Sequence, residues 1–412
     1  MNSALNHNQP KIMHIDLNSC FATVEQQAYP NLRGKPILIA AYTTPNGCVL
    51  APSIEAKRFG IKTGMTVRDA RLLCPGVIVR DPDPEMVRHI HLRLKNLLSF
   101  FSPGVFPKSI DELVLDFDHT YALKKDLAKI GLEIKNRIRK EIGEHLSCNI
   151  GISTNRFLAK LAAGLHKPDG LDIIDHKNLK KVYENCSLTD LHGINTRFQA
   201  RLNASGIFTP LEFLDASLQT LQKRVFKSIC GYYWFFRLRG FEIDAVEFQR
   251  KSYGQSYALK NQTKDPKELS QLLMKLCEKM GRRLRRNNFC AFGVHVSCVY
   301  TNLTHWHTGR IFPTGLYSTQ ELFTKALYLL NKQPERKKLR ELAVSCFNLI
   351  STNNEQLDLF SKNMEKKRGL QKAIDRINDR WGEFALTPAL MMGMKDIIVD
   401  RVAFGGTKEL EG

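Results

Sequence analysis

The feature that most constrains the fold is the placement of three acidic residues beside strand-like runs. Asp16 follows the predicted short strand 11–15, and Asp111 and Glu112 stand directly before the predicted strand 113–117. If these strands share one sheet, the three carboxylates meet at the strand ends, where such a group can hold two divalent cations. Taken alone, an Asp-Glu pair is more often a solvated turn, so this interpretation needs support from the rest of the chain.

The charge of the chain indicates a polyanionic partner. Its 412 residues include 61 Lys and Arg against 41 Asp and Glu, a formal net charge of +20 at pH 7. Nucleic acid is the partner that this charge favours, and a membrane surface is the alternative. No apolar run approaches the roughly 20 residues that span a bilayer, and residues 1–7 lack the apolar region of a secretory signal. We therefore expect a soluble, cytoplasmic protein with no membrane contact.

The order of predicted elements is typical of an α+β protein with several domains. Residues 77–172 alternate strands with helices at 85–101, 123–142 and 155–165, which suits a ferredoxin-like sheet. A small block at 24–76 precedes them. Further along the chain we expect short helices at 173–240, a linker at 241–251, a second α+β domain at 252–350 and a polar tail at 351–412 with an amphipathic segment.

Basic side chains near the acids could neutralise a triphosphate. Lys57 lies in a short helix that ends at Gly60, and Lys160 lies in the helix after the strand 148–152. The backbone amides of residues 19–21 open another helix, where they favour an anion. Either lysine alone is more often an ordinary solvated helix residue. The two lysines support a triphosphate site only in combination with the three acids.

Several short motifs, in a fixed order over about residues 11–350, resemble those of the Y-family translesion DNA polymerases. They are Asp16-Leu17-Asn18-Ser19-Cys20-Phe21-Ala22, Gly34-Lys35-Pro36, Glu55-Ala56-Lys57-Arg58-Phe59-Gly60, Ser109-Ile110-Asp111-Glu112, Gly151-Ile152-Ser153-Thr154-Asn155 with Lys160, and Lys167-Pro168-Asp169-Gly170. The chain is similar to the bacterial polymerase IV-like members, while its fingers resemble the catalytic subunit of polymerase V.

The resemblance implies a right-hand polymerase fold. The palm would comprise residues 1–23 and 77–172, the fingers 24–76, and the thumb, with its helix–hairpin–helix, 173–240. The linker at 241–251 would lead to the little finger at 252–350 and the tail at 351–412. The implied activity is template-directed, low-fidelity DNA synthesis past lesions, without proofreading. There are two alternatives. One is a non-enzymatic accessory protein that binds DNA and the clamp, and the other is a metal-dependent nuclease.

The resemblance also implies roles for individual residues. Asp16, Asp111 and Glu112 would hold two Mg²⁺ ions together with the backbone carbonyl of Leu17. Phe21 stands at the steric-gate position that excludes a ribose 2′-hydroxyl. The contacts to the incoming deoxynucleoside triphosphate would come from Ser19, Cys20, Phe21, Lys57 and Lys160.

Two positions depart from the polymerase IV-like pattern. Where those relatives carry a tyrosine and an arginine at the triphosphate, this chain has Ile54 and Lys57. Ile54 donates no hydrogen bond from its side chain, and Lys57 lacks the bidentate fork of arginine.

Candidate contacts to primer–template DNA and to a sliding clamp lie further along the chain. Backbone amides at Gly193, Ile194 and Asn195 could hold a DNA phosphate. A basic cluster, which could equally be a solvated face, could bind further phosphates through Arg282, Arg283, Arg285 and Arg286. The tail carries a segment that resembles a bacterial clamp-binding peptide, in which the contacts would come from Gln356, Leu357, Leu359 and Phe360. Damage-response accessory subunits are a further class of partner.

Overall fold

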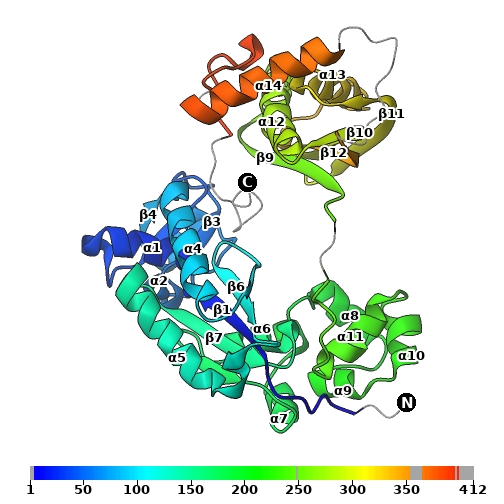
Figure 1. Cartoon of the computed structure of the whole chain (residues 1–412). Helices are drawn as coiled ribbons and strands as arrows, with labels where there is room; N and C mark the ends of the chain where they lie inside the picture. Colours follow the sequence, from blue (N-terminus) through cyan, green and yellow to red (C-terminus); the bar gives the residue numbers. More distant parts are fainter. Residues whose placement is uncertain (1–3, 247–248, 353–363, 395–396, 399–412) are drawn as a thin grey trace. The chain divides into compact units, whose positions relative to one another are not determined.

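The computed structural model describes residues 4–246, 249–352, 364–394 and 397–398 (Figure 1). The described chain divides into a first unit up to residue 246 and a second unit from residue 249. In the described residues, no helix has the length and apolar character that crossing a membrane requires.

The first unit is built on a five-stranded sheet in the order β5-β6-β1-β7-β8. Its central strand β1 is antiparallel to β6 and β7, and the register sets Asp16 opposite Glu112 on one side and Asn149 on the other. The strands that carry the acids are therefore neighbours, as the sequence predicts. The strands are β1 (Ile12–Leu17), β5 (Gly104–Pro107), β6 (Glu112–Asp116), β7 (Cys148–Ser153) and β8 (Leu171–Ile173).

Helices cover both faces of this sheet because alternate residues of β1 are apolar on one face and partly polar on the other. Met13 and Ile15 enter a core shared with α1 (Cys20–Ala28), α4 (Pro84–Ser99) and α5 (Leu127–Arg137). Ile12 faces Ala159 of α6 (Arg156–Leu165) on the opposite side. His14 and Asp16 alternate with Met13 and Ile15, so they share the face of α6.

The helix expected over 123–142 is split into three pieces. A 3₁₀ turn (Tyr121–Lys124) precedes α5, whose first turn is capped by the Asp126 carboxylate accepting from the Ala128 amide at 2.9 Å. A π-helical turn (Ile138–Ile142) follows α5. The Asp126 cap is the local reason why α5 begins at Leu127.

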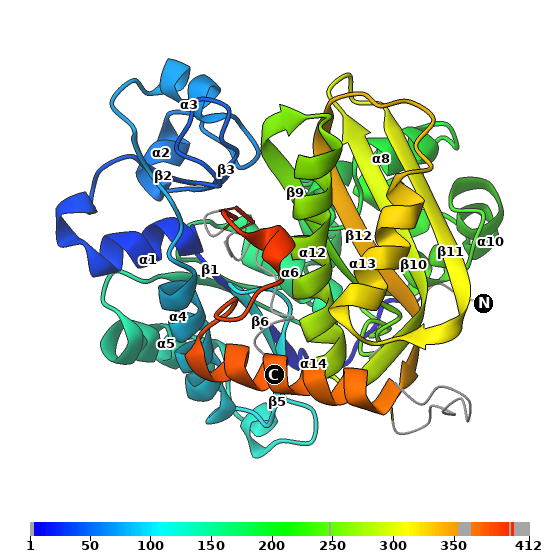
Figure 2. The ribbon, with the colours of Figure 1, turned by 90° about the horizontal axis from the view of Figure 1, so that it is seen from above.

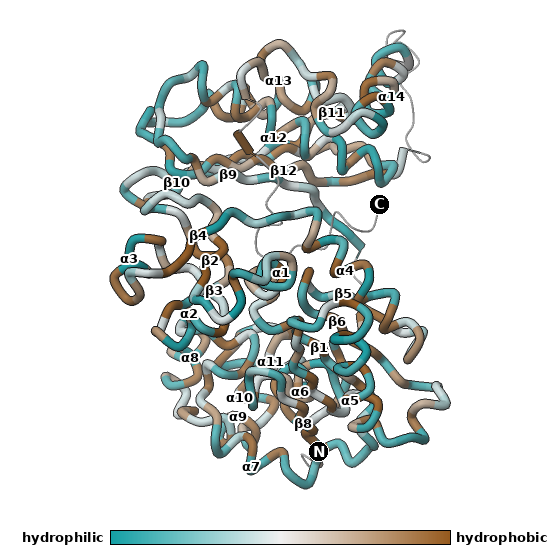
Figure 3. Tube along the Cα trace, turned by 90° about the vertical axis from the view of Figure 1, so that its left-hand side faces the viewer, coloured by the Kyte–Doolittle hydropathy of each residue, from teal (hydrophilic) through white to brown (hydrophobic). Residues whose placement is uncertain are grey.

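A smaller three-stranded sheet with its own core lies between β1 and β5 in the sequence. Its order is β3-β2-β4, with β2 antiparallel to β3 and parallel to β4. Figure 3 shows β2 among the most hydrophobic segments of the chain, in keeping with the complete burial of Ile37–Ala40. The elements are β2 (Ile37–Ala40), β3 (Val49–Pro52), α2 (Ile54–Arg58), α3 (Val67–Leu73) and β4 (Ile78–Arg80).

Short helices follow the five-stranded sheet and pack around aromatic side chains. Trp234 contacts Phe157, Phe213 and Phe226, with ring centroids 5.4, 5.4 and 6.2 Å away. Phe157 belongs to α6, so this helical layer shares its core with the sheet. The helices are α7 (Leu179–Glu184), α8 (Thr196–Asn203), α9 (Pro210–Asp215), α10 (Leu218–Thr220) and α11 (Cys230–Leu238).

The second unit is a four-stranded antiparallel sheet in the order β11-β10-β12-β9 (Figure 2). Two helices, α12 (Pro266–Arg286) and α13 (Thr319–Leu330), pack side by side on one face of it. The strands alternate buried and partly exposed residues, as expected of a sheet with one open face. They are β9 (Ser252–Thr263), β10 (Phe289–Tyr300), β11 (His305–Leu316) and β12 (Leu339–Ser351).

The described residues 364–394 and 397–398, which follow β12 in the sequence, pack on this second unit. Helix α14 (Met364–Trp381) bonds to α12, and Met391, Met394 and Ile398 enter the core of the unit. Asp375 accepts two hydrogen bonds from Arg285, at 2.6 and 2.9 Å, and Asp379 accepts one from Arg282 at 2.8 Å.

These contacts engage Arg282 and Arg285, for which the sequence predicts contacts with DNA. Both residues are buried, with exposed fractions of 4% and 5%, and their charges are matched by α14. Arg286 remains exposed beside Asp379, and Arg283 donates to the Gly254 carbonyl at 2.6 Å. The clamp-binding peptide at 356–360 lies outside the described residues.

Candidate active site

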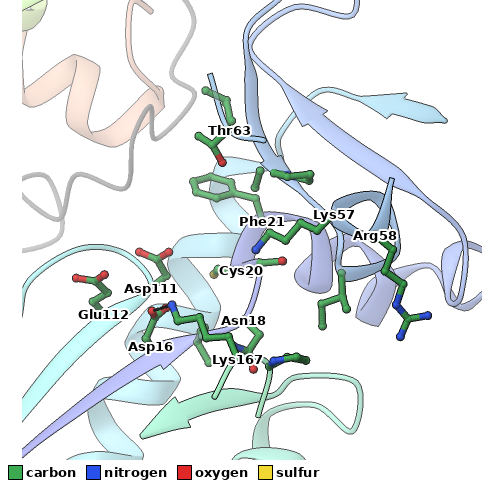
Figure 4. Close-up of a pocket in the computed structure, with 17 residues that line it drawn as sticks. Asp16, Asn18, Cys20, Phe21, Lys57, Arg58, Thr63, Asp111, Glu112 and Lys167 are labelled. Atoms are coloured by element: carbon green, nitrogen blue, oxygen red, sulfur yellow. Dashed lines mark hydrogen bonds and ion pairs between the residues drawn. The ribbon is translucent and has the colours of Figure 1, made fainter. Parts of the chain in front are cut away.

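Asp16, Asp111 and Glu112 line one cavity of about 650 Å³ in the first unit (Figure 4). Two strand ends bring them together. β1 ends at Leu17, whose amide donates to the Asp111 carbonyl at 3.0 Å, and β6 begins at Glu112. This backbone bond ties the two acid-bearing segments to each other directly.

The protein itself does not fully neutralise the negative charge of this group. Burial raises the pKa of the Asp111 carboxyl above its usual range, and the charges of Asp16 and Glu112 raise it further. The Ser109 hydroxyl, which donates to Asp111 Oδ1 at 2.5 Å, acts in the opposite direction. A buried carboxylate in this situation favours a bound cation.

Lysines pair with the other two acids. Lys160 Nζ lies 2.9 and 2.7 Å from the two oxygens of Glu112, and Lys167 pairs with Asp16. In the described residues, no three acidic, histidine or cysteine side chains are close enough together to hold a metal ion at once. The three carboxylates nevertheless offer only oxygen atoms, which are the ligands that Mg²⁺ prefers. Mg²⁺ fits this site once Lys160 moves away from Glu112 and Lys167 moves away from Asp16.

His14 stands behind Glu112 as a neutral side chain. Burial, and then the charge of Lys160, lower its pKa to about 3. Its Nε2 lies 3.8 Å from Glu112 Oε2 and has no hydrogen-bond partner. His14 therefore adds no charge to the carboxylates at neutral pH.

The rest of the cavity carries cations that suit an anion. Lys57, Arg58 and Lys167 all line it. Burial lowers the pKa of Lys57, and the neighbouring charge of Lys167 lowers it further. A bound phosphate would stabilise the charged form of Lys57.

Phe21 and Ile54 supply the apolar lining. Phe21 is only 6% exposed, and Figure 4 shows its ring facing Thr63. Ser19, with φ of 48° in the left-handed region, and Cys20 line the cavity where α1 begins. Ile54 also lines the cavity, so the departure from the polymerase IV-like pattern falls in the site itself.

The sequence and the fold of known proteins identify the family. Residues 15–164 match the model of the impB/mucB/samB family, and residues 250–359 match the model of its C-terminal domain. The DNA polymerase IV of Pelotomaculum thermopropionicum is 31% identical over 396 residues, which cover 95% of this chain and 97% of the relative. This chain belongs to the Y family of translesion DNA polymerases. A second relative, the DNA polymerase IV of Moorella thermoacetica, is 32% identical over 92% of this chain and 96% of its own length.

Solved structures agree on the fold of this Y-family polymerase. A chimera of the Y-family DNA polymerases Dbh and Dpo4 has a TM-score of 0.72 at 24% identity, covering 82% of this chain and 99% of the chimera. An insertion ternary complex of Dbh DNA polymerase has a TM-score of 0.57 at 23% identity, with the same coverage. The α+β fold inferred from the sequence is thereby confirmed.

Sequence reasoning and structure differ on which lysine stands at the cavity. Lys160 was predicted to contact the nucleotide, but it is not among the described residues that line the cavity, and it binds Glu112 instead. Lys167 lines the cavity and was not among the predicted contacts. The signal was present in the sequence, since Lys167 opens a motif that already resembles the family. Arg58 and Thr63 were also missed. Arg58 lies in the motif 55–60 beside Lys57, whereas no motif quoted from the sequence includes Thr63.

The predicted phosphate-binding amides of the helical layer are partly occupied. The Ile194 amide donates to the Leu191 carbonyl at 2.9 Å, and the Ile194 side chain is buried. The Asn195 side chain caps α8 by accepting from the Arg197 and Phe198 amides. Gly193 adopts φ of 99°, a left-handed conformation that suits glycine. The Ile194 amide is therefore not available to a phosphate in this conformation.

Proposed function

We propose that this chain is a template-directed DNA polymerase that copies past lesions. It adds a deoxynucleoside monophosphate to a primer 3′-hydroxyl and releases pyrophosphate, with low fidelity and no proofreading step. The observation that carries the proposal is the single cavity that Asp16, Asp111 and Glu112 line together with Lys57 and Lys167. Carboxylates and cations that line one cavity suit a reaction that transfers a nucleotidyl group from a triphosphate.

Asp16, Asp111, Glu112 and the Leu17 carbonyl would hold two Mg²⁺ ions. Bound there, the ions supply charge neutralisation at the phosphates and lower the pKa of the attacking hydroxyl. The chain's own contribution is to hold the carboxylate oxygens close together and shielded from water. Burial of Asp111 and its hydrogen bond from Ser109 serve that purpose.

The remaining side chains bind and select the nucleotide. Lys57 and Lys167 hold the triphosphate, and the amides of Ser19, Cys20 and Phe21 at the start of α1 add hydrogen bonds. The Phe21 ring occupies the space that a ribose 2′-hydroxyl would need. Lys160 holds both oxygens of Glu112 until the ions bind, and then moves aside.

The partners follow from the same proposal. Primer–template DNA contacts the backbone amides of Gly193 and Asn195 and the side chains of Arg283 and Arg286. A sliding clamp binds the peptide at 356–360, and damage-response accessory subunits could join the complex. Because its relatives include bacterial DNA polymerases and bacterial DNA lies in the cytoplasm, we propose a cytoplasmic location.

Primer extension with Mg²⁺ tests the function. The variant with Asp111→Ala and Glu112→Ala is expected to lose at least about a thousandfold in insertion rate, because both ions lose ligands. The matched control carries Glu133→Ala and Glu184→Ala, two exposed acids that change the net charge equally, and should extend like the unmodified chain. The proposal fails if the unmodified chain binds primer–template and adds no nucleotide, while shortening of the primer would indicate a nuclease instead.

A further inference from the structure

Two buried asparagines hold the loop that carries Lys167. The loop comprises residues 166–170, between α6 and β8. The side-chain oxygen of Asn18 accepts from the Asp169 amide at 2.9 Å, and the side-chain nitrogen of Asn149 donates to the His166 carbonyl at 2.9 Å. These contacts lie on either side of Lys167 and Pro168, so both ends of this short segment are tied to the central sheet.

The two asparagines also bond to each other and to a third side chain. Asn18 Nδ2 donates to Asn149 Oδ1 at 2.7 Å, and the Ser147 hydroxyl donates to Asn18 Oδ1 at 3.0 Å. Asn149 is completely buried and Asn18 is 5% exposed. Because buried polar groups are costly to leave unpaired, this network favours a single arrangement.

The loop backbone packs closely against the network at Gly170 and is also bound by Lys135. A Cβ on Gly170 would lie 2.2 Å from the His166 carbonyl oxygen and 3.1 Å from Asn149 Nδ2. On its other side, the Lys135 ammonium lies 3.0 Å from the Asp169 carboxylate and 3.2 Å from the Gly170 carbonyl oxygen. The backbone of the loop is thus held from two sides while the Lys167 side chain points into the cavity beside Asp16 (Figure 4).

We propose that Asn18 and Asn149 are positioning residues for Lys167, and that they determine how tightly the site binds the triphosphate of the incoming nucleotide. The inference rests on the proposed function, in which Lys167 contacts that triphosphate. Asn18 directly follows Leu17, so one residue connects the strand end that carries Asp16 with the loop that carries Lys167. Asn149 is not among the described residues that line the cavity, so it acts through Lys167 rather than on the nucleotide.

Single-turnover insertion kinetics on the full chain test this coupling. Asn149→Ala should raise the Kd of the incoming deoxynucleotide about tenfold while lowering the maximal insertion rate less, because the carboxylates keep their places. Lys167→Ala should raise the same Kd by at least about tenfold. In the double variant, Asn149→Ala should raise the nucleotide Kd little beyond the value of Lys167→Ala alone, because the ammonium group that Asn149 positions is gone. An equal effect of Asn149→Ala with and without Lys167 would overturn the inference.

A matched control and a readout independent of activity separate positioning from stability. Asn378→Ala removes an equally buried asparagine of the second unit, which bonds to Leu386. It should lower the Tm without changing the Kd of the nucleotide. Hydrogen exchange of the Asp169 amide should accelerate in Asn18→Ala, and unchanged exchange would contradict the network. If Asn18→Ala does not fold, Ser147→Ala weakens the same network by one bond and should accelerate this exchange less.

The failure of the inference can be told from the failure of the proposed function. If Lys167→Ala raises the nucleotide Kd and Asn149→Ala does not, the positioning role is wrong and the polymerase function stands. If Lys167→Ala has no effect on the nucleotide Kd, the proposed triphosphate contact is wrong, and the positioning role falls with it.

Discussion

Phe21 is the residue whose size we propose to select the sugar of the incoming nucleotide. Its ring is almost fully buried in the cavity wall, where it faces Thr63. Phe21→Ala should open space for a 2′-hydroxyl and raise ribonucleotide insertion relative to deoxynucleotide insertion at least about tenfold. The measurement is the ratio of kcat/KM for the two sugars, with Phe100→Ala, an exposed phenylalanine, as the control. An unchanged ratio would remove Phe21 as the gate.

Glu278 is a residue whose charge should make stability depend on pH. Burial raises the pKa of its carboxyl, and the hydrogen bond from Thr319 and the charge of Arg285 only partly oppose this. Ionisation of the carboxyl therefore costs stability. The cost is absent below the pKa of an unfolded glutamate, about 4.3, and is complete once the pH exceeds the raised pKa of the folded state.

Glu278→Gln should accordingly gain stability relative to the unmodified chain as the pH rises from 4 to 7. Glutamine keeps an oxygen that accepts from Thr319 but carries no buried charge. Urea unfolding of both proteins at the two pH values measures the difference. A variant that loses relative stability over this range would show that attraction to Arg285 outweighs the effect of burial.

At the scale of elements, α14 and α12 depend on each other through charge. The Arg285 side chain is only 2% exposed and forms a bidentate pair with Asp375 of α14. Asp375→Ala removes the carboxylate that binds this buried arginine, which should lower the free energy of unfolding of the second unit by about 3 kcal/mol. Urea unfolding provides the measurement. As the control, Glu335→Ala breaks an exposed ion pair with Lys337. It should change the free energy of unfolding by less than about 1 kcal/mol.

At the scale of the whole molecule, the chain should join a catalytic unit to a sliding clamp through its C-terminal part. Leu359→Ala with Phe360→Ala removes two of the three large apolar residues of the proposed clamp peptide. We expect these substitutions to abolish stimulation by the clamp and to leave extension without clamp unchanged, because the peptide is separate in sequence from the catalytic carboxylates. Primer extension with and without the clamp is the measurement, and equal stimulation of both proteins would exclude the peptide as the contact.

The sequence by itself determined the acidic site, the candidate gate and the α+β class. Asp16, Asp111, Glu112 and Phe21 lie in short local motifs, and strand and helix periodicity are local properties too. Only the tertiary structure decided which cations serve the site. Lys167 reaches Asp16 because two buried asparagines hold its loop, and Arg282 and Arg285 turn inward because α14, about 90 residues later, supplies their acids. Whether a charged side chain faces solvent or a partner depends on contacts distant in the chain, and no local pattern records them.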